Sequence, residues 1–110
     1  MTKQQYQSCI DACVRCAQEC EECANHCLGG EASMAECARL CIDCAGIGWA
    51  TAASMSRGSQ FAAALCGVCA SACDVCAAQC EQMQDEHCRR TAEACRRCAD
   101  ECRQMAGGAR

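Results

Sequence analysis

Cysteine supplies the chemically reactive side chains of this sequence, with eighteen among 110 residues. Most lie three or four residues from the next cysteine. Side chains at these intervals share one face of an α-helix, with Cβ atoms roughly 5–6 Å apart. Two sulfur atoms at that separation can turn toward one metal ion, and soft thiolates select Cu(I), zinc or iron–sulfur clusters. The candidate metal ligands are Cys9, Cys13, Cys16, Cys20, Cys23, Cys27, Cys37, Cys41, Cys44, Cys66, Cys69, Cys73, Cys76, Cys80, Cys88, Cys95, Cys98 and Cys102.

Charge and coordination number favour Cu(I) among these metals. Ionising every thiol would add eighteen negative charges to a chain whose formal net charge is already −4, and buried charges need compensation. One monovalent ion per thiolate restores the original charge. Linear two-coordinate Cu(I), with each sulfur bridging two ions, gives about that ratio and needs only a continuous series of thiols. We therefore predict multiple Cu(I) ions, roughly one per cysteine.

A zinc or mixed-metal thiolate buffer is the alternative function. Structural zinc sites are closed tetrahedral groups of four ligands, usually from turns at two places in the chain. A uniform helical series of cysteines does not divide itself into groups of four. We therefore expect zinc only as an adventitious guest.

Three further interpretations leave the cysteines without metal. A core of free thiols would work as packing, but Ala, Val or Leu would do the same without the risk of oxidation. A thiol redox protein would use its CxxC pairs in a thioredoxin-like setting of strand and helix, which this helical pattern does not offer. A disulfide scaffold suits a small secreted chain better than a regular helical register.

Four helical segments position these cysteines, and together they predict an all-α chain with one domain over residues 1–110. We expect helices over about 3–28, 34–56, 60–83 and 86–106, with Gly29 and Gly30 ending the first. The turn between the last two helices is predicted near 82–86. The predicted N-terminal caps are Thr2 with Gln5, Ser33 with Glu36, Ser59, and Asp85.

The short connections and the absence of proline predict an antiparallel up-down-up-down four-helix bundle with a cysteine-lined core. Leu, Ile, Val and Phe together number only ten, too few for an ordinary hydrophobic core. The cysteine faces of the four helices should therefore converge along one axis. Gly48, Thr51, Met55 and Thr91 interrupt the series, so we expect fewer ions beside them.

The two ends of such a bundle differ in composition. The turn after the first helix lies beside the turn after the third, which brings His26, Met34, Met83 and His87 to one end. These neutral ligands could receive Cu(I) and pass it to the thiols by ligand exchange, although packing and surface roles are equally reasonable. At the opposite end we expect a packed plug of Tyr6, Met55, Phe61, Leu65 and Met105.

The other faces of the middle helices suggest an association between copies of the chain. Apolar residues lie outside the cysteine seams of both helices, and we expect an interface with Ile42, Trp49, Val68 and Val75 as its anchors. Contacts inside the bundle are the alternative for the alanines of the second helix, which are Ala35, Ala38, Ala45 and Ala52.

Composition and the first residues limit the compartment and the partners. Ten basic against fourteen acidic residues leave no basic patch for nucleic acid. Residues 1–10 do not resemble a secretory signal, and we expect no membrane-spanning segment. A cytoplasmic location with reduced thiols follows, and such thiols more often bind metal than form disulfides. His26 and His87 lie near helix ends rather than beside a nucleophile, so we expect a binding protein and not an enzyme.

The helical CxxxC series over four segments resembles the bacterial copper storage proteins, and more specifically their cytosolic branch. The resemblance spans nearly the whole chain. It implies a four-helix bundle whose inward cysteines bind many Cu(I) ions, a homotetramer, and a copper entrance of His and Met residues. Copper chaperones or small thiols could deliver or extract the ions. The balance between storage and detoxification is left open.

Overall fold

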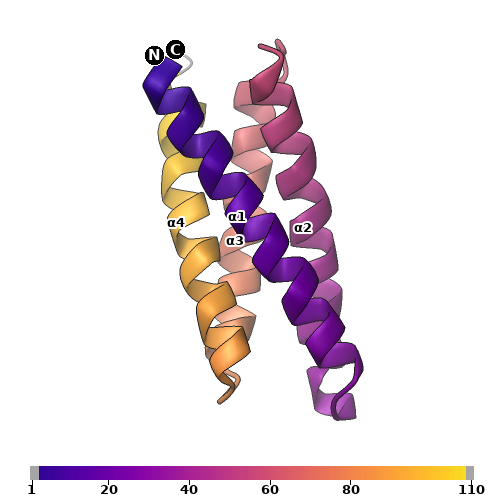
Figure 1. The fold of residues 1–110 in the computed structure, drawn as a ribbon. Helices are drawn as coiled ribbons and strands as arrows, with labels where there is room; N and C mark the ends of the chain where they lie inside the picture. The colour runs from indigo at the N-terminus through magenta and orange to yellow at the C-terminus, as the bar shows by residue number, and fades with distance from the viewer. Residues whose placement is uncertain (1–2, 109–110) are drawn as a thin grey trace.

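The computed structural model describes residues 3–108, and these form four long α-helices joined by short connections. They are α1 (Lys3–Leu28), α2 (Ala35–Ser56), α3 (Ala62–Glu81) and α4 (Glu86–Gly108), and a 3₁₀ turn, η1 (Ala32–Met34), precedes α2. Within residues 3–108 there is no strand. Successive helices run in opposite directions (Figure 1). The predicted all-α, up-down-up-down bundle is confirmed.

Local capping explains where the later helices begin. Asp85 Oδ1 accepts hydrogen bonds from the backbone N–H groups of His87, at 2.8 Å, and Cys88, at 3.4 Å, as expected of an N-cap. Ser59 Oγ accepts the N–H of Phe61 at 3.0 Å, and α3 starts at Ala62, two residues later than expected.

The caps predicted for the first two helices involve Thr2 and Ser33. Met34 occupies the N-cap position of α2 and makes no side-chain cap. The side chain of Ser33 and all of Thr2 lie outside the described residues.

The turn between α2 and α3 depends on a glycine. Gly58 has φ +64°, which side chains other than glycine's rarely allow. This conformation lets the Ser59 N–H reach back to the Ser54 carbonyl at 2.9 Å, while the Gly58 N–H reaches Met55 at 3.1 Å. The chain therefore reverses direction within a few residues, and α3 packs directly against α2.

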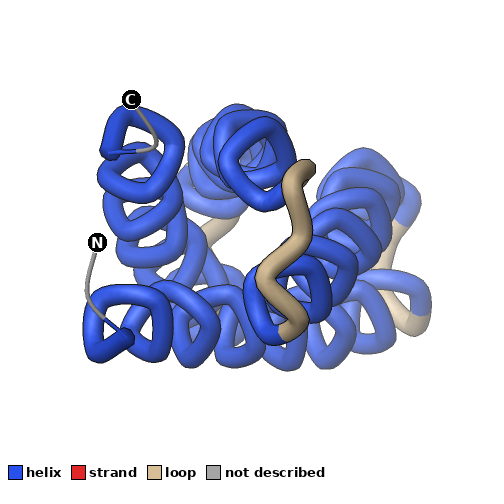
Figure 2. The backbone as a smooth tube through the Cα atoms, turned by 90° about the horizontal axis from the view of Figure 1, so that it is seen from above, coloured by secondary structure: helices blue, strands red, loops and turns tan. Residues whose placement is uncertain are grey.

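The bundle measures 43 × 18 × 18 Å, and each helix packs against two neighbours. Viewed from above, the four helices surround a common axis (Figure 2). Gly48 allows α1 and α2 to approach closely, because a Cβ atom there would lie 3.4 Å from both Ala17 Cβ and the Cys13 carbonyl oxygen. The small side chains of Cys and Ala therefore fill a narrow interior.

Cysteine forms the core, as the sequence predicts. Every one of the eighteen cysteines is at most 2% exposed, and alanines pack at their flanks. The larger buried apolar side chains are Met55 and Met105, while Thr51, Ser54 and Thr91 are buried polar residues among the described part of the chain. All buried side-chain N and O atoms of the described residues have a hydrogen-bond partner.

The expected plug at the Tyr6 end is only partly correct. Tyr6, Met55 and Met105 do meet there, but they line an open pocket of about 220 Å³ rather than filling the space. Phe61 is 63% exposed and does not line the pocket. Phe61 occupies the N-cap position, just before the first residue of α3. Its side chain is therefore not on the buried face of the helix and is not part of the core.

Helix α3 also corrects the expectation that no segment could span a membrane. Ala62–Glu81 is long and apolar enough by length and composition, with a mean hydropathy of 1.5 in its most apolar window. Cys and Ala, which count as apolar, supply most of that value. The cysteine face of α3 is buried against the other helices, so its hydropathy reflects its part in the core of the bundle.

Candidate metal centre

The eighteen cysteines form sets of close sulfur contacts that follow one another along the bundle axis, here called the thiol column. Interactions of Cys69 with Cys73 and of Cys20 with Cys41 link one set to the next. Seventeen of them have a thiol neighbour at a sulfur–sulfur separation of 3.5–4.0 Å, and these contacts cross between all four helices. Cys16 Sγ, for example, lies 3.6 Å from Cys95 Sγ and 3.7 Å from Cys73 Sγ. The remaining one, Cys66, lies with Cys9 and Cys102 in a group of three at one end. The column therefore runs the length of the bundle.

All eighteen cysteines are free thiols, which agrees with the prediction of a reduced core. The closest contact, between Cys37 and Cys80, is 3.5 Å, far longer than a disulfide bond of roughly 2.05 Å. With metal–sulfur bonds of roughly 2.3 Å, two sulfurs on one ion lie about 4.0 Å apart in trigonal and about 4.6 Å apart in linear coordination. Small outward movements of these side chains therefore allow an ion between neighbouring sulfurs.

The thiols also gather in groups of four, which the sequence argument did not expect. Within such a group every sulfur lies within 4.8 Å of the others. The reason is tertiary: the helical series has no grouping of its own, but the helices converge on one axis, and three of the four contribute one or two thiols to each group. The groups are Cys13, Cys69, Cys98 and Cys102; Cys16, Cys20, Cys44 and Cys95; Cys23, Cys27, Cys37 and Cys88; and Cys23, Cys37, Cys41 and Cys80.

These groups share members, and this sharing decides what metals they suit. Cys23 and Cys37 belong to two groups of four, and Cys102 belongs to both a group of four and the terminal group of three. Closed tetrahedral zinc sites cannot occupy overlapping groups at once without bridging thiolates. A chain of bridged Cu(I) ions uses shared sulfurs directly. The groups that share no sulfur could each hold a zinc ion, but binding metal at all eighteen thiols favours copper.

Burial and crowding control the ionisation of the thiols. Desolvation, followed by repulsion from Cys23 and Cys37, raises the pKa of Cys27 from 9.0 to about 12. The same causes raise the pKa of Cys88. Deeper in the column, hydrogen bonds from Cys102 and then Cys13 lower the pKa of Cys69 to about 5. Hydrogen bonds between thiols thus lower some of the pKa values while burial and repulsion raise others, and ionising the whole core requires compensating cations.

Two threonines occupy positions in the cysteine faces. Thr51 donates its hydroxyl hydrogen to the Ile47 carbonyl at 2.7 Å, and Thr91 donates to the His87 carbonyl at 3.0 Å. Both side chains are fully buried. Their hydroxyl groups donate to carbonyl groups of the helix backbone and are poor ligands for a soft ion. Fewer sulfur ligands are therefore available at these two levels of the column.

The histidines expected at one end of the bundle are in contact there. The rings of His26 and His87 stack with centroids 5.0 Å apart and planes 18° apart. His26 Nε2–H donates to Asp85 Oδ2 at 2.9 Å, and this hydrogen bond holds the pKa of the Asp85 carboxyl below its ordinary value of 3.8. The proton on Nε2 leaves Nδ1 of His26 as the nitrogen available to a metal. Cys27 and Cys88 follow these histidines directly in sequence.

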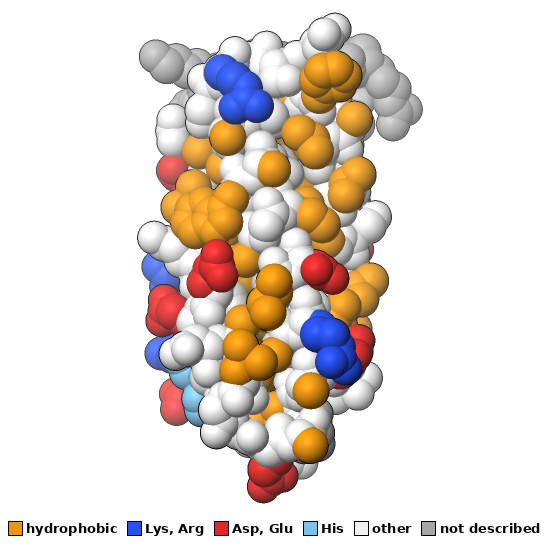
Figure 3. Space-filling view, turned by 90° about the vertical axis from the view of Figure 1, so that its right-hand side faces the viewer, with side chains coloured by type: hydrophobic (Ala, Val, Ile, Leu, Met, Phe, Trp, Pro, Cys, Tyr) orange, Lys and Arg blue, Asp and Glu red, His pale blue; other side chains and the backbone are white. Residues whose placement is uncertain are grey.

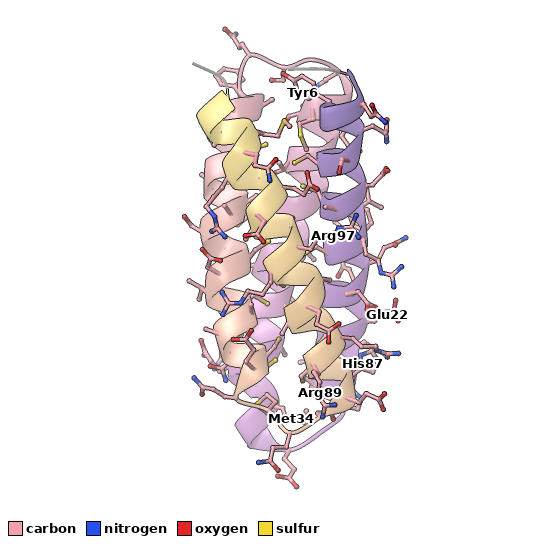
Figure 4. The ribbon with its side chains drawn as sticks, turned by 90° about the vertical axis from the view of Figure 1, so that its left-hand side faces the viewer. Tyr6, Glu22, Met34, His87, Arg89 and Arg97 are labelled. Atoms are coloured by element: carbon pink, nitrogen blue, oxygen red, sulfur yellow. The ribbon has the colours of Figure 1, made fainter. Side chains whose placement is uncertain are left out.

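The methionines at this end lie nearer the core. Met34 and Met83 are half-buried and pack against the cysteine cluster. Figure 4 shows Met34 and His87 toward one end of the bundle and Tyr6 at the other. The structure thus brings the four predicted residues to the end where Cys23, Cys27, Cys37 and Cys88 form their group.

Sequence reasoning missed two features of the site. It treated Asp85 only as a helix cap, whereas the carboxylate also orients His26. It treated Met55 as packing, whereas Cys66 Sγ donates a hydrogen bond to Met55 Sδ at 3.7 Å. The signal available for the second feature was the position of Met55 four residues after Thr51, on the same face of α2 as Cys44.

Solved structures resemble this chain over nearly its whole length. A cytosolic copper storage protein from Streptomyces lividans with five coppers has a TM-score of 0.91 and 37% identity, covering 96% of this chain and 94% of the other. Copper storage protein 3 from Bacillus subtilis, in its apo form, has a TM-score of 0.88 and 35% identity, covering 91% and 97%. A protein from Nitrosospira multiformis has a TM-score of 0.90 and 41% identity, covering 96% and 98%.

Two comparisons of the sequence complete this picture. A search of curated protein sequences gives no match. A family model described as copper storage protein matches residues 2–107, which is almost the entire chain. Together with the buried thiol column, these matches show that the chain belongs to the copper storage protein family.

Proposed function

We propose that this protein stores Cu(I) in the cytoplasm by binding roughly one ion per cysteine along the thiol column. The observation that carries the proposal is the continuity of the column: eighteen buried free thiols, with neighbouring sulfurs 3.5–4.0 Å apart in contacts that cross between helices. A solved relative from Streptomyces lividans is described as loaded with 10 copper equivalents. Storage of a soft monovalent cation accounts for the number of thiols, their burial and their close spacing.

Each binding event exchanges a proton for a cation. Cu(I) forms bonds to two sulfurs, the thiol proton leaves to water, and no electron is transferred. The charge of the core therefore stays constant during loading, which removes the penalty of burying many thiolates. Hydrogen bonds from neighbouring thiols lower the pKa of Cys69 to about 5, so this thiol gives up its proton to an arriving ion more readily than Cys27.

Copper reaches the column at the His/Met end, which comprises His26, Met34, Met83 and His87. The Nδ1 atom of His26 and the two thioethers are neutral ligands that bind Cu(I) more weakly than thiolate. Such ligands can hold an arriving ion and release it to Cys27 or Cys88. Asp85 keeps the His26 ring in place through its 2.9 Å hydrogen bond.

Anaerobic titration tests the storage function. Cu(I) is added as its acetonitrile complex against a competing chromophoric chelator, and Zn(II) is titrated in parallel. We expect Cu(I) to saturate far above four or five ions per chain, with release of about one proton per ion. Saturation of Cu(I) at four ions or fewer would overturn the proposal.

Zinc storage is the second candidate, because the structure does contain groups of four thiols. Overlap between the groups limits zinc to the few that share no sulfur. We expect Zn(II) to saturate at a small number of ions and to be displaced by Cu(I). A zinc capacity equal to the copper capacity would favour the buffer instead.

We propose that this chain associates with copies of itself through the outer faces of α2 and α3, as a homotetramer. Ile42, Trp49, Val68 and Val75 are 39–56% exposed, and apolar side chains gather over this face (Figure 3). A groove of about 310 Å³ runs between the two helices beside Val68 and Val75. Exposed apolar faces of this kind favour burial in an interface.

Other parts of the expected interface lie inside the bundle. Ala38, Ala45 and Ala52 are buried within the single chain, which favours internal packing for these three, whereas Ala35 is half-buried. Trp49 remains accessible, although its Nε1–H donates to Glu21 Oε2 at 3.1 Å. The interface therefore rests on the large apolar side chains alone. Copper-carrying chaperones or small thiols are the other partners we propose.

A further inference from the structure

The Tyr6 end of the bundle contains a second cluster of sulfur ligands that the His/Met end does not include. Met55 on α2, Cys66 on α3 and Met105 on α4 line one pocket, together with Tyr6 on α1. All three sulfur-bearing side chains are at most 5% exposed, so they form the inner wall of the pocket. Two methionines and a cysteine therefore line the pocket where the thiol column approaches solvent.

The contacts within this cluster connect it to the column. Cys66 Sγ lies 3.7 Å from Met55 Sδ, a separation similar to the sulfur contacts inside the column. On the other side, the thiols of Cys66, Cys9 and Cys102 lie within 4.8 Å of one another. Sulfur atoms thus continue without interruption from the pocket wall to the first group of three thiols.

The pocket is shaped to admit a ligand rather than to exclude water. Its volume is about 220 Å³, whereas one water needs roughly 10–15 Å³ on this kind of measure. Ser59 and Gln60 supply polar atoms at its wall, and Ala62 and Ala63 leave space beside Cys66. A plug built only for packing would have bulky apolar side chains in these positions.

We infer that this pocket, with Met55, Cys66 and Met105, is a second transfer site for Cu(I), at the opposite end of the bundle from the histidines. The inference rests on the proposed storage function. Thioether sulfur is a soft, uncharged ligand with no proton to lose, so it selects Cu(I) over Zn(II) and holds it weakly.

Transfer from this site into the column balances without an oxidant. Bonds between Cu(I) and the thioethers break as bonds to Cys66 and then to Cys9 or Cys102 form. Each thiol that becomes a thiolate ligand releases its proton through the pocket to water. Copper stays monovalent throughout, and the two ends of the column can load or unload independently.

Methyl NMR at low copper tests where the ion binds. The chain is labelled with [ε-¹³C]methionine, and one equivalent of Cu(I) is added anaerobically as its acetonitrile complex. We expect the resonances of Met55 and Met105 to shift, with assignments from single Met→Leu variants. One equivalent of Zn(II) should leave both unchanged. Shifts confined to Met34 and Met83, with copper bound, would overturn the inference.

Uptake kinetics test whether the site carries copper. In a His26→Ala/His87→Ala background, we expect Met55→Leu with Met105→Leu to slow Cu(I) uptake about tenfold, which corresponds to roughly 1.4 kcal/mol in the barrier. Leu preserves the volume and apolar character of Met, so the fold is retained. Ile47→Leu in the same background is the matched control, because this volume-conserving change lies outside both ends and should leave the uptake rate unchanged.

The outcomes separate this inference from the storage function. Equal uptake rates with and without Met55→Leu/Met105→Leu would overturn the second site while leaving the high copper capacity intact. A wild-type capacity of only a few ions would overturn storage itself, whatever the rates. Final capacity in the double variant should fall by no more than about one ion, because the column is unchanged.

Discussion

Thr91 donates its hydroxyl hydrogen to the carbonyl oxygen of His87 at 3.0 Å, one helical turn before it on α4. This hydrogen bond holds a non-ligating side chain within the cysteine face of the helix. Thr91 is fully buried and neighbours Cys23 in the column. The interruption therefore has a defined place, and its effect on copper capacity can be measured.

Replacing Thr91 with Cys should extend the thiol column. The new sulfur would stand beside Cys23, and we expect the anaerobic Cu(I) capacity to rise by about one ion per chain. Thr91→Ser is the matched control, because it keeps a hydroxyl and should leave the capacity unchanged. An unaltered capacity in Thr91→Cys would show that the thiols around this level are already saturated.

The stability of the metal-free protein should fall as the pH rises above 9. Unfolded thiols ionise near their ordinary pKa of 9.0, whereas the pKa of Cys27 in the fold is about 12 and that of Cys88 is also raised. The folded state then binds more protons than the unfolded state, so unfolding becomes easier with increasing pH. This contribution to stability is complete below pH 9 and is lost progressively toward pH 12.

Thermal unfolding at a series of pH values, under anaerobic conditions, measures this effect. Copper loading should abolish it, because the bound thiols no longer carry protons. A melting temperature of the metal-free protein that is constant between pH 8 and pH 11 would contradict the expected ionisation.

Asp85 should affect copper uptake and helix stability through different oxygen atoms. Asp85→Asn keeps a good N-cap for α4 but loses the charge that strengthens the bond to His26, so we expect slower uptake with nearly unchanged stability. Asp85→Ala loses both roles and should also destabilise the fold by about 1 kcal/mol.

Stopped-flow uptake and urea unfolding measure these two effects separately. The kinetics are best followed in the Met55→Leu/Met105→Leu variant, where the other end cannot compensate. Uptake by Asp85→Asn at the rate of its parent would show that orientation of His26 does not matter.

Charged residues on the outer face of α3 should prevent self-association. Val68 and Val75 are 52% and 56% exposed, so changing both to Glu removes little internal packing. We expect sedimentation at the mass of one chain for this variant and at a higher mass for the wild type. A wild-type protein that sediments as a single chain would refute the interface.

A similar change on α1 is the control for that experiment. Gln18 lies on a polar surface outside the proposed interface, and Gln18→Glu should leave the sedimentation of the wild type unaltered. The helical content of both variants should match the wild type, since exposed substitutions of this kind change stability little.

The sequence by itself determined the helices and the inward face of each one. Cysteines three and four residues apart can share a buried face only in an α-helix, so the series Cys9 to Cys27 specifies both the element and its orientation. The short connections then dictate antiparallel neighbours. The choice of a soft monovalent metal followed from the same residues, because their number and burial require one cation for each thiolate.

Only the tertiary structure decided how residues from different helices meet. The grouping of thiols in fours, the hydrogen bond from His26 to Asp85 and the contact of Cys66 with Met55 depend on the relative height and rotation of packed helices. Periodicity within one helix carries no information on these quantities. The late start of α3, which leaves Phe61 exposed and a pocket open beside Met55, depends in turn on the local geometry of the Gly58 turn.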